Sequence, residues 1–139
     1  METKNKTEKK EDVKTAVVRG RDMGISTKHA IAICKFLKGK TIARAKLELN
    51  EVLKMKRAIP MDYEVPHRKG NITGGRYPIK AAEYFIKLLN SLEANANAKG
   101  IDLANAKIHC IANKASKPYH PGKYRGRRFK RSHVEITLK

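Results

Sequence analysis

The sequence predicts a small α+β domain with a long basic β-hairpin arm extending from it. Three stretches before Gly100 carry apolar residues at helical spacing, which indicates amphipathic helices. Two shorter stretches after Gly100 alternate apolar and polar residues, which is typical of strands with one buried face. Between these two strands lies "PYHPGKYRGRRFKR" (118–131), which carries six Lys and Arg and no acid, so it cannot build a hydrophobic core.

The N-terminal end is predicted to lie outside the folded part. Residues 1–12 are polar and mixed in charge, so we expect a disordered tail there. They contain no apolar run typical of a signal peptide or membrane anchor. Residues 13–139 are expected to form a single domain, which opens with the short β-favouring run "VKTAVVRGR" (13–21).

Two helices are predicted before Pro60. The first begins at Ser26 or Thr27, whose hydroxyl can cap it, and ends near Gly39. The second begins at Thr41 and is closed by Pro60, because proline disfavours helix in the residue before it. The link between them is short, so we expect the two helices to pack as antiparallel neighbours. The residues expected to face the core are Ala30, Ile33, Cys34 and Leu37 in the first helix, and Ile42, Ala45, Leu49, Val52 and Leu53 in the second.

A loop and a third helix follow. Two prolines and three glycines within residues 60–77 argue against any regular element there, and a loop of this length is usually functional or disordered. Pro78 suits the first turn of a helix that ends at Gly100. The residues expected on its buried face are Ala82, Phe85, Leu89, Leu92 and Ala96.

The two C-terminal strands are predicted at 107–112 and 133–139. The first places Ile108, Cys110 and Ala112 on one face, and the second alternates in the same way. The segment between them, 113–132, is far longer than the ~2 to 5 residues of a tight hairpin turn. We therefore expect a hairpin whose arm, 113–132, runs beyond the body of the protein.

The composition of the arm favours contact with folded RNA. No acid occurs between Leu103 and Val134, whereas nine Lys and Arg do. Lysine supplies point charges for phosphates, and arginine adds planar bidentate donors that also stack on bases. Tyr119, Tyr124 and Phe129 interleave with these charges and can stack on unpaired bases. An irregular RNA surface suits such a segment better than one groove of a regular duplex.

The charge of the whole chain points to the same class of partner. Its net charge is +19, from 32 Lys and Arg against 13 Asp and Glu. Such an excess opposes compaction by self-repulsion, which a polyanion relieves. Nucleic acid is the commonest polyanion, and an anionic membrane surface is the alternative.

Other chemistries have little support in the sequence. Cys34 and Cys110 lie in apolar contexts and are expected to be core thiols in a reducing compartment rather than a disulfide. The five histidines are scattered, and no spacing predicts a zinc site or another metal site. No base is evident beside a serine or cysteine nucleophile, so neither an enzyme nor a cofactor is expected.

Several blocks together resemble a known family. In order, they are "ISTKHAIAICKFLKGKTIARAKLELNEVLKMKRAIP", "HRKG", "GGRYPIKAAEYFIKLLNSLEANANAKGIDL" and the closing "HVEITL". Their order and spacing over residues 17–139 resemble the L-twenty-two family of large-subunit ribosomal proteins, in its archaeal and eukaryotic form.

This resemblance implies a fold, partners and a location. The fold is three helices packed on a small three-stranded antiparallel sheet, with a hairpin that penetrates the large-subunit RNA. The implied partners are large-subunit ribosomal RNA, neighbouring ribosomal proteins near the exit tunnel, and the nascent peptide at the arm tip, with neither a membrane nor a small-molecule substrate. The protein would be a cytoplasmic, non-enzymatic constituent of the large ribosomal subunit. Gly126 and Arg127 stand only six residues before His133, so the arm is expected to be shorter than is usual in the family.

The expected RNA contacts come from the arm and from the body. The arm residues are Lys114, Lys117, Tyr119, Lys123, Tyr124, Arg125, Arg127, Arg128, Phe129, Lys130 and Arg131. The body residues are Arg57, His67, Arg68, Lys69 and Arg76, with Arg19, Arg21 and Lys28 as further candidates.

Two other functions are open at this point. The short link between the first two helices loosely resembles a helix-turn-helix, which favours a basic DNA-architectural protein. Neither helix, however, clusters Asn, Gln and Arg on one polar face for reading bases. An RNA-processing enzyme is the other alternative, against which the absence of an evident acid–base pair argues.

Overall fold

The computed structural model describes residues 15–62, 65–70 and 74–139. The predicted tail, 1–12, lies outside these residues. In chain order the elements are β1 (Ala16–Met23), α1 (Thr27–Leu37), α2 (Ile42–Leu53), β2 (Ile59–Pro60), β3 (Gly75–Arg76), α3 (Ile79–Ala98), β4 (Ile108–Lys114), a 3-10 turn (Gly122–Tyr124) and β5 (Ser132–Leu138).

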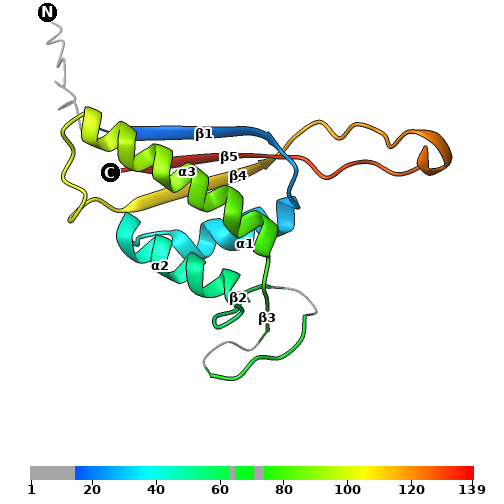
Figure 1. Ribbon diagram of the computed structural model, residues 1–139, viewed down its shortest axis with the longest axis horizontal. Helices are drawn as coiled ribbons and strands as arrows, with labels where there is room; N and C mark the ends of the chain where they lie inside the picture. Colours follow the sequence, from blue (N-terminus) through cyan, green and yellow to red (C-terminus); the bar gives the residue numbers. More distant parts are fainter. Residues whose placement is uncertain (1–14, 63–64, 71–73) are drawn as a thin grey trace, which may run out of the picture.

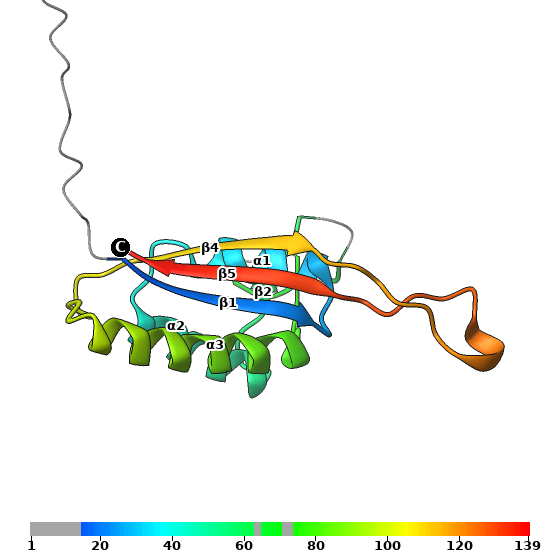
Figure 2. The ribbon, with the colours of Figure 1, turned by 90° about the horizontal axis from the view of Figure 1, so that it is seen from above.

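The main sheet has three antiparallel strands in the order β1-β5-β4, so the C-terminal strand is central. Ala16 and Ile108 both pair with Leu138, which sets the register of the two ladders. Helix α1 packs against β4 and helix α3 against β1, and Figure 2 shows the strands side by side from above. The predicted fold class, three helices on a small antiparallel sheet, is confirmed.

The core lies between the sheet and the helices. Alternate residues of β5 are buried in it, namely Val134, Ile136 and Leu138. Phe85 and Leu89 of α3 are fully buried in the same cluster. The predicted apolar faces of α1 and α3 are buried at every position, and in α2 only Leu53 is half-exposed. Periodicity therefore identified the inner face of each helix.

The predicted antiparallel pairing of α1 and α2 is wrong. Helix α1 packs on β4, and helix α2 packs on α3 (Figure 2). The link between them is attached to the sheet, because Gly39 N donates to Ile108 O and Ile108 N donates to Lys40 O, both at 2.9 Å. Gly39 has a φ of +78°, which glycine adopts without strain. The chain therefore turns at β4 and leaves α1 instead of folding back along it.

The predicted hydroxyl cap of α1 is also wrong. Ser26 occupies the N-cap position but makes no capping side-chain bond. The Thr27 hydroxyl lies 3.0 Å from the Ser132 hydroxyl, which in turn bonds the Ile25 carbonyl at 3.0 Å. These side chains join the start of α1 to the start of β5, where the arm returns to the body.

Two boundaries differ from the sequence prediction. Helix α2 ends at Leu53, well before Pro60, because Met55 takes a positive φ of 54° that ends the helix. The region after it is not free of regular structure, since Ile59 pairs with Arg76 and Pro60 with Gly75. A proline is tolerated in such a two-residue ladder because few backbone bonds are needed there.

The cysteines were predicted to be unlinked, and this is wrong. Cys34 of α1 and Cys110 of β4 form a disulfide, with their Cα atoms 5.0 Å apart. Their predicted place in the core is correct for Cys34, which is buried, whereas Cys110 is half-exposed. The packing of α1 on β4 brings the two together, and a separation of 76 residues hides this in the sequence.

Candidate nucleic-acid interface

The arm runs on from β4 and β5 beyond the end of the sheet (Figures 1 and 2). Its two sides are joined by their own backbone bonds, from Phe129 N to Pro118 O and from His120 N to Arg127 O, both 2.9 Å long. At the tip, Gly122 begins the 3-10 turn with a φ of +64°. The arm is therefore a hairpin held by its own ladder, while residues 121–130 are all exposed.

Aromatic side chains are held outward along the arm by neighbouring cations. Tyr119 and Tyr124 are 59% and 48% exposed. The Arg128 guanidinium lies 4.5 Å from the Tyr119 ring centre and that of Arg127 lies 5.3 Å from the Tyr124 ring. Such cation–π contacts limit the side-chain freedom that binding must otherwise remove. The arm thus presents ordered cations and stacking surfaces together.

The structure groups several predicted contacts in a hollow at the root of the arm. It has a volume of about 430 Å³ and is lined by the start of α1 and by both sides of the arm. Four predicted residues meet there: Lys28, Lys114, Lys117 and Lys130. Since all four are lysines, the hollow concentrates positive charge where the arm leaves the body.

A second hollow, of about 550 Å³, lies beside the loop that follows α2. It brings together the predicted residues Arg57, His67, Arg68 and Lys69. Two contacts orient the Arg68 side chain. Its Nε donates to Gly75 O at 3.1 Å, and its guanidinium lies 4.9 Å from the Tyr77 ring centre. This loop therefore holds a positioned arginine.

Three predicted residues lie apart from these groups. Arg19 forms an ion pair with Glu135 at 2.9 Å on the outer face of the sheet, which offsets its charge. Arg21 lines a hollow of about 440 Å³ with Arg19 at the same face. Arg76 is exposed on β3 but does not line the loop hollow.

The largest of these hollows lies between the arm and the body, and we call it the junction hollow. Its volume is about 690 Å³, and its walls come from the starts of α1 and α3 and from arm residues 120 and 128–131. The His120 and Phe129 rings stack 3.6 Å apart on its arm side. Burial, together with the charges of Lys130 and Arg76, lowers the pKa of His29, so its imidazole is neutral at pH 7.

Sequence reasoning missed some of the residues that line these hollows. They are Lys56 and Tyr77 in the loop hollow, and Gly24, Lys80 and His120 in the junction hollow. One signal was available for Lys80, because it stands in the first turn of α3, where acids are preferred. The others gather through tertiary packing, which local patterns do not report.

The described residues offer no group of three or more His, Cys, Asp and Glu that could hold a metal ion. None of the helices that they form combines the length and apolar character needed to cross a bilayer.

Comparisons with known proteins find a matching family model and similar chains. A family model described as ribosomal protein L22p/L17e matches residues 18–139. The chain is similar to the large ribosomal subunit protein uL22 of Archaeoglobus fulgidus, with 46% identity over 110 residues that cover 75% of this chain and 71% of the relative. The protein of the same name from Methanoculleus marisnigri is 36% identical over 134 residues, covering 88% of each chain. That of Sulfolobus acidocaldarius is 36% identical over 139 aligned positions, covering 88% of this chain and 86% of the relative.

Proposed function

The chain belongs to the ribosomal protein L22p/L17e family, and from this premise we propose that its arm and basic hollows bind large-subunit ribosomal RNA. It is a structural protein of the large ribosomal subunit and not an enzyme, and its location is the cytoplasm, where that subunit works.

The arm is the observation that carries the RNA assignment. Between Ala115 and Lys130 it packs no buried side chain, so it contributes nothing to the core that would explain its length. Its exposed cations replace condensed counterions on phosphates, and its aromatic rings offer stacking surfaces for unpaired bases. The ordering entropy of the arm is reduced because its root is already fixed by the β4–β5 ladder.

The body contributes a second set of contacts. The loop hollow around Arg68 and the arm-root hollow around Lys28 both present cations on the same molecule. A rigid body with several separate cationic hollows can bind more than one RNA segment at once. This supports a role in cross-bracing the large-subunit RNA during assembly.

The arm tip is proposed to reach the peptide exit tunnel. The 3-10 turn at Gly122–Tyr124 closes the end of the arm that lies farthest from the body, which suits a position along a tunnel wall. There it would face the nascent peptide, while the body contacts neighbouring ribosomal proteins near the tunnel exit.

A DNA-architectural role loses its support from the fold. A helix-turn-helix requires its two helices to pack against each other, with the second exposed for a groove. Here α1 packs on β4 and α2 on α3, so the pair does not form that unit.

The Arg127→Ala/Arg128→Ala double variant of the full chain tests the proposal. Both side chains are exposed, so we expect an unchanged melting temperature. Affinity for large-subunit ribosomal RNA should fall about tenfold or more, and the slope of log K against log salt should become shallower by ~1 to 2. Filter binding at several salt concentrations measures both quantities.

A Lys54→Ala/Lys87→Ala variant is the matched control. It removes the same charge from exposed positions outside the arm and the hollows. We expect a smaller loss of affinity than in the arm variant. Equal losses in the two variants would show that total charge, and not the arm, determines binding.

A further inference from the structure

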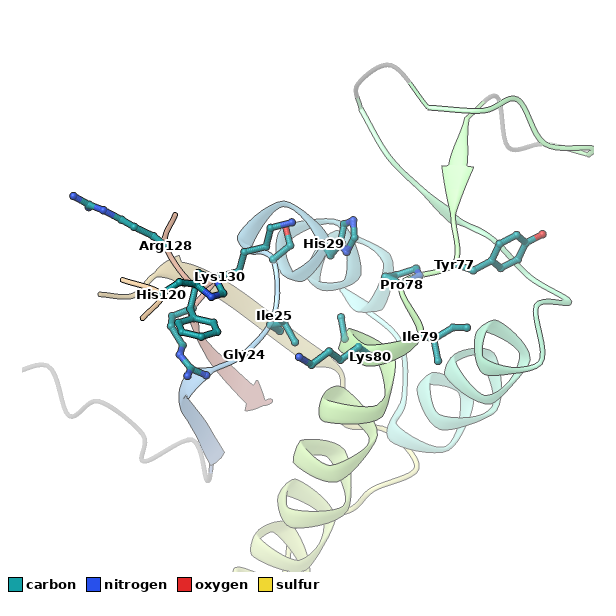
Figure 3. Close-up of a pocket in the computed structure, with 14 residues that line it drawn as sticks. Gly24, Ile25, His29, Tyr77, Pro78, Ile79, Lys80, His120, Arg128 and Lys130 are labelled. Carbon is teal, nitrogen blue, oxygen red and sulfur yellow. The ribbon is translucent and has the colours of Figure 1, made fainter. Parts of the chain in front are cut away.

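We propose that the junction hollow binds one phosphate group of the RNA backbone, held between Lys80 and Arg131 beside Gly24. This rests on the proposed function, because it takes the anion to be RNA, and it adds a specific site that locks the arm to the body. The hollow is lined by the starts of α1 and α3 and by the arm (Figure 3).

Two cations from distant parts of the sequence converge on Gly24. A Cβ built on Gly24 would lie 3.1 Å from Arg131 Nη1 and 3.7 Å from Lys80 Nζ. Figure 3 shows the Lys80 side chain reaching from α3 toward Gly24. Because both positive groups approach the same Cβ position, they repel each other, and an anion between them replaces that repulsion with two attractions.

The two cations are not neutralised by the protein. Within the described part of the chain, neither Lys80 nor Arg131 belongs to an ion pair, and no acid lines the junction hollow. Arg131 Nη1 lies 3.5 Å from the Asp22 carbonyl, which orients the guanidinium without cancelling its charge. His29, held neutral, leaves the binding to groups that are charged at every physiological pH.

The position of Lys80 is unfavourable unless an anion is present. It stands in the first turn of α3, where the positive end of the helix dipole disfavours a cation. A phosphate bound at the Lys80 ammonium offsets that cost, because its negative charge attracts the lysine. The charge arrangement therefore favours the binding of an anion.

Gly24 provides the space for this phosphate. Its φ does not lie in the left-handed region, so its backbone conformation does not require glycine. The missing side chain instead leaves a gap between the two cations that a methyl group would fill.

A phosphate at this place would join three elements. Gly24 precedes α1, Lys80 is the second residue of α3, and Arg131 is the last arm residue before β5. The same ligand would therefore fix the arm's root to both helices. Binding of the body and docking of the arm would become one coupled event.

The test uses the full chain, large-subunit ribosomal RNA and interference by phosphate ethylation. Lys80→Gln is compared with Lys87→Gln, which removes the same charge from an exposed position on the same helix. We expect one phosphate whose ethylation weakens binding of the wild type and of Lys87→Gln but not of Lys80→Gln. The Lys80→Gln chain should bind RNA about tenfold more weakly, in keeping with a lost charge-assisted bond, and Lys87→Gln less than twofold more weakly.

Gly24→Ala supplies a second variant that keeps every charge. The added methyl group meets only the ends of two long side chains, which can shift by rotation, so the melting temperature should stay unchanged. Loss of the same interference signal in this variant would support the site. An unaltered signal would overturn it.

Other outcomes are also decisive. Equal losses of RNA affinity and identical interference patterns for Lys80→Gln and Lys87→Gln would overturn the junction site. The proposal that the protein binds RNA would still stand. Inorganic phosphate could instead shift the NMR signal of the Gly24 amide in the free chain while Lys80→Gln leaves RNA binding unchanged. This result would assign the hollow to a free anion and would contradict the proposal that the bound phosphate belongs to RNA. Absence of any salt-dependent RNA binding by the wild type would instead reject the proposed function itself.

Discussion

Glu48 is a buried carboxylate of α2 that cations surround. Lys40 Nζ donates to one of its oxygens, while Arg44 Nε and Arg57 Nη1 lie 3.1 and 3.3 Å from the other. Burial alone raises the pKa of Glu48, but the bonds from Lys40 and Arg44 and the attraction of Arg57 outweigh it, so the pKa is lowered. The carboxylate thus holds three cations in a chain rich in positive charge.

The first prediction concerns this residue. Glu48→Gln should lower the free energy of unfolding by about 3 kcal/mol at pH 7, because it removes the anion from a group that is only 4% exposed. Urea denaturation measures this loss. Glu51→Gln is the control, since Glu51 is exposed and its pair with Arg57 at 3.6 Å should be worth less than about 1 kcal/mol.

The stability that Glu48 contributes should depend on pH. A carboxyl whose folded pKa is lowered stabilises the protein above its ordinary pKa, and this stabilisation is lost as the pH falls through the folded value. The difference in free energy of unfolding between the wild type and Glu48→Gln should therefore become smaller in strong acid. A difference that does not change with pH would show that the loss comes from packing and not from charge.

At the scale of elements, the sequence predicted what is local and missed what is not. The buried faces of the helices follow from spacing within each helix, and residues such as Phe85 and Leu92 lie where that spacing placed them. The partner of each helix depends on the turn at Gly39, whose bonds to Ile108 no local pattern reveals. The end of α2 at Leu53 also differs from the predicted end at Pro60, because the positive φ of Met55 ends the helix earlier in the chain.

The disulfide between α1 and β4 gives a prediction at this scale. The intact mass of the purified, non-reduced chain should be lower by two hydrogens than that of the reduced chain. Reduction should lower the free energy of unfolding by about 2 to 4 kcal/mol, since a long loop is opened.

The Cys34→Ala/Cys110→Ala chain is the control for that measurement, and its stability should not respond to a reductant. Alkylation of both cysteines in the denatured, non-reduced wild type would contradict the bond.

At the scale of the whole molecule, the apolar core and the cationic surface have separate roles. The core holds the sheet and helices together, while the arm and the hollows carry cations at its surface. The sequence identified the arm, because a run of 113–132 without acids is visible along the chain. It did not identify the junction hollow, because Gly24, Lys80 and Arg131 meet only when the chain is folded.

Retention on the ribosome after a high-salt wash tests the role of the arm most directly. The wild-type chain is compared in a sucrose gradient with a variant in which residues 115–131 are replaced by an Asn-Gly turn, which suits the β4–β5 hairpin. The body of this variant should remain folded, because the removed residues are not part of the core. We predict that the wild type stays with the large subunit and the variant is washed to the top of the gradient. Equal retention of the two chains would contradict the proposal that the arm anchors this protein in ribosomal RNA.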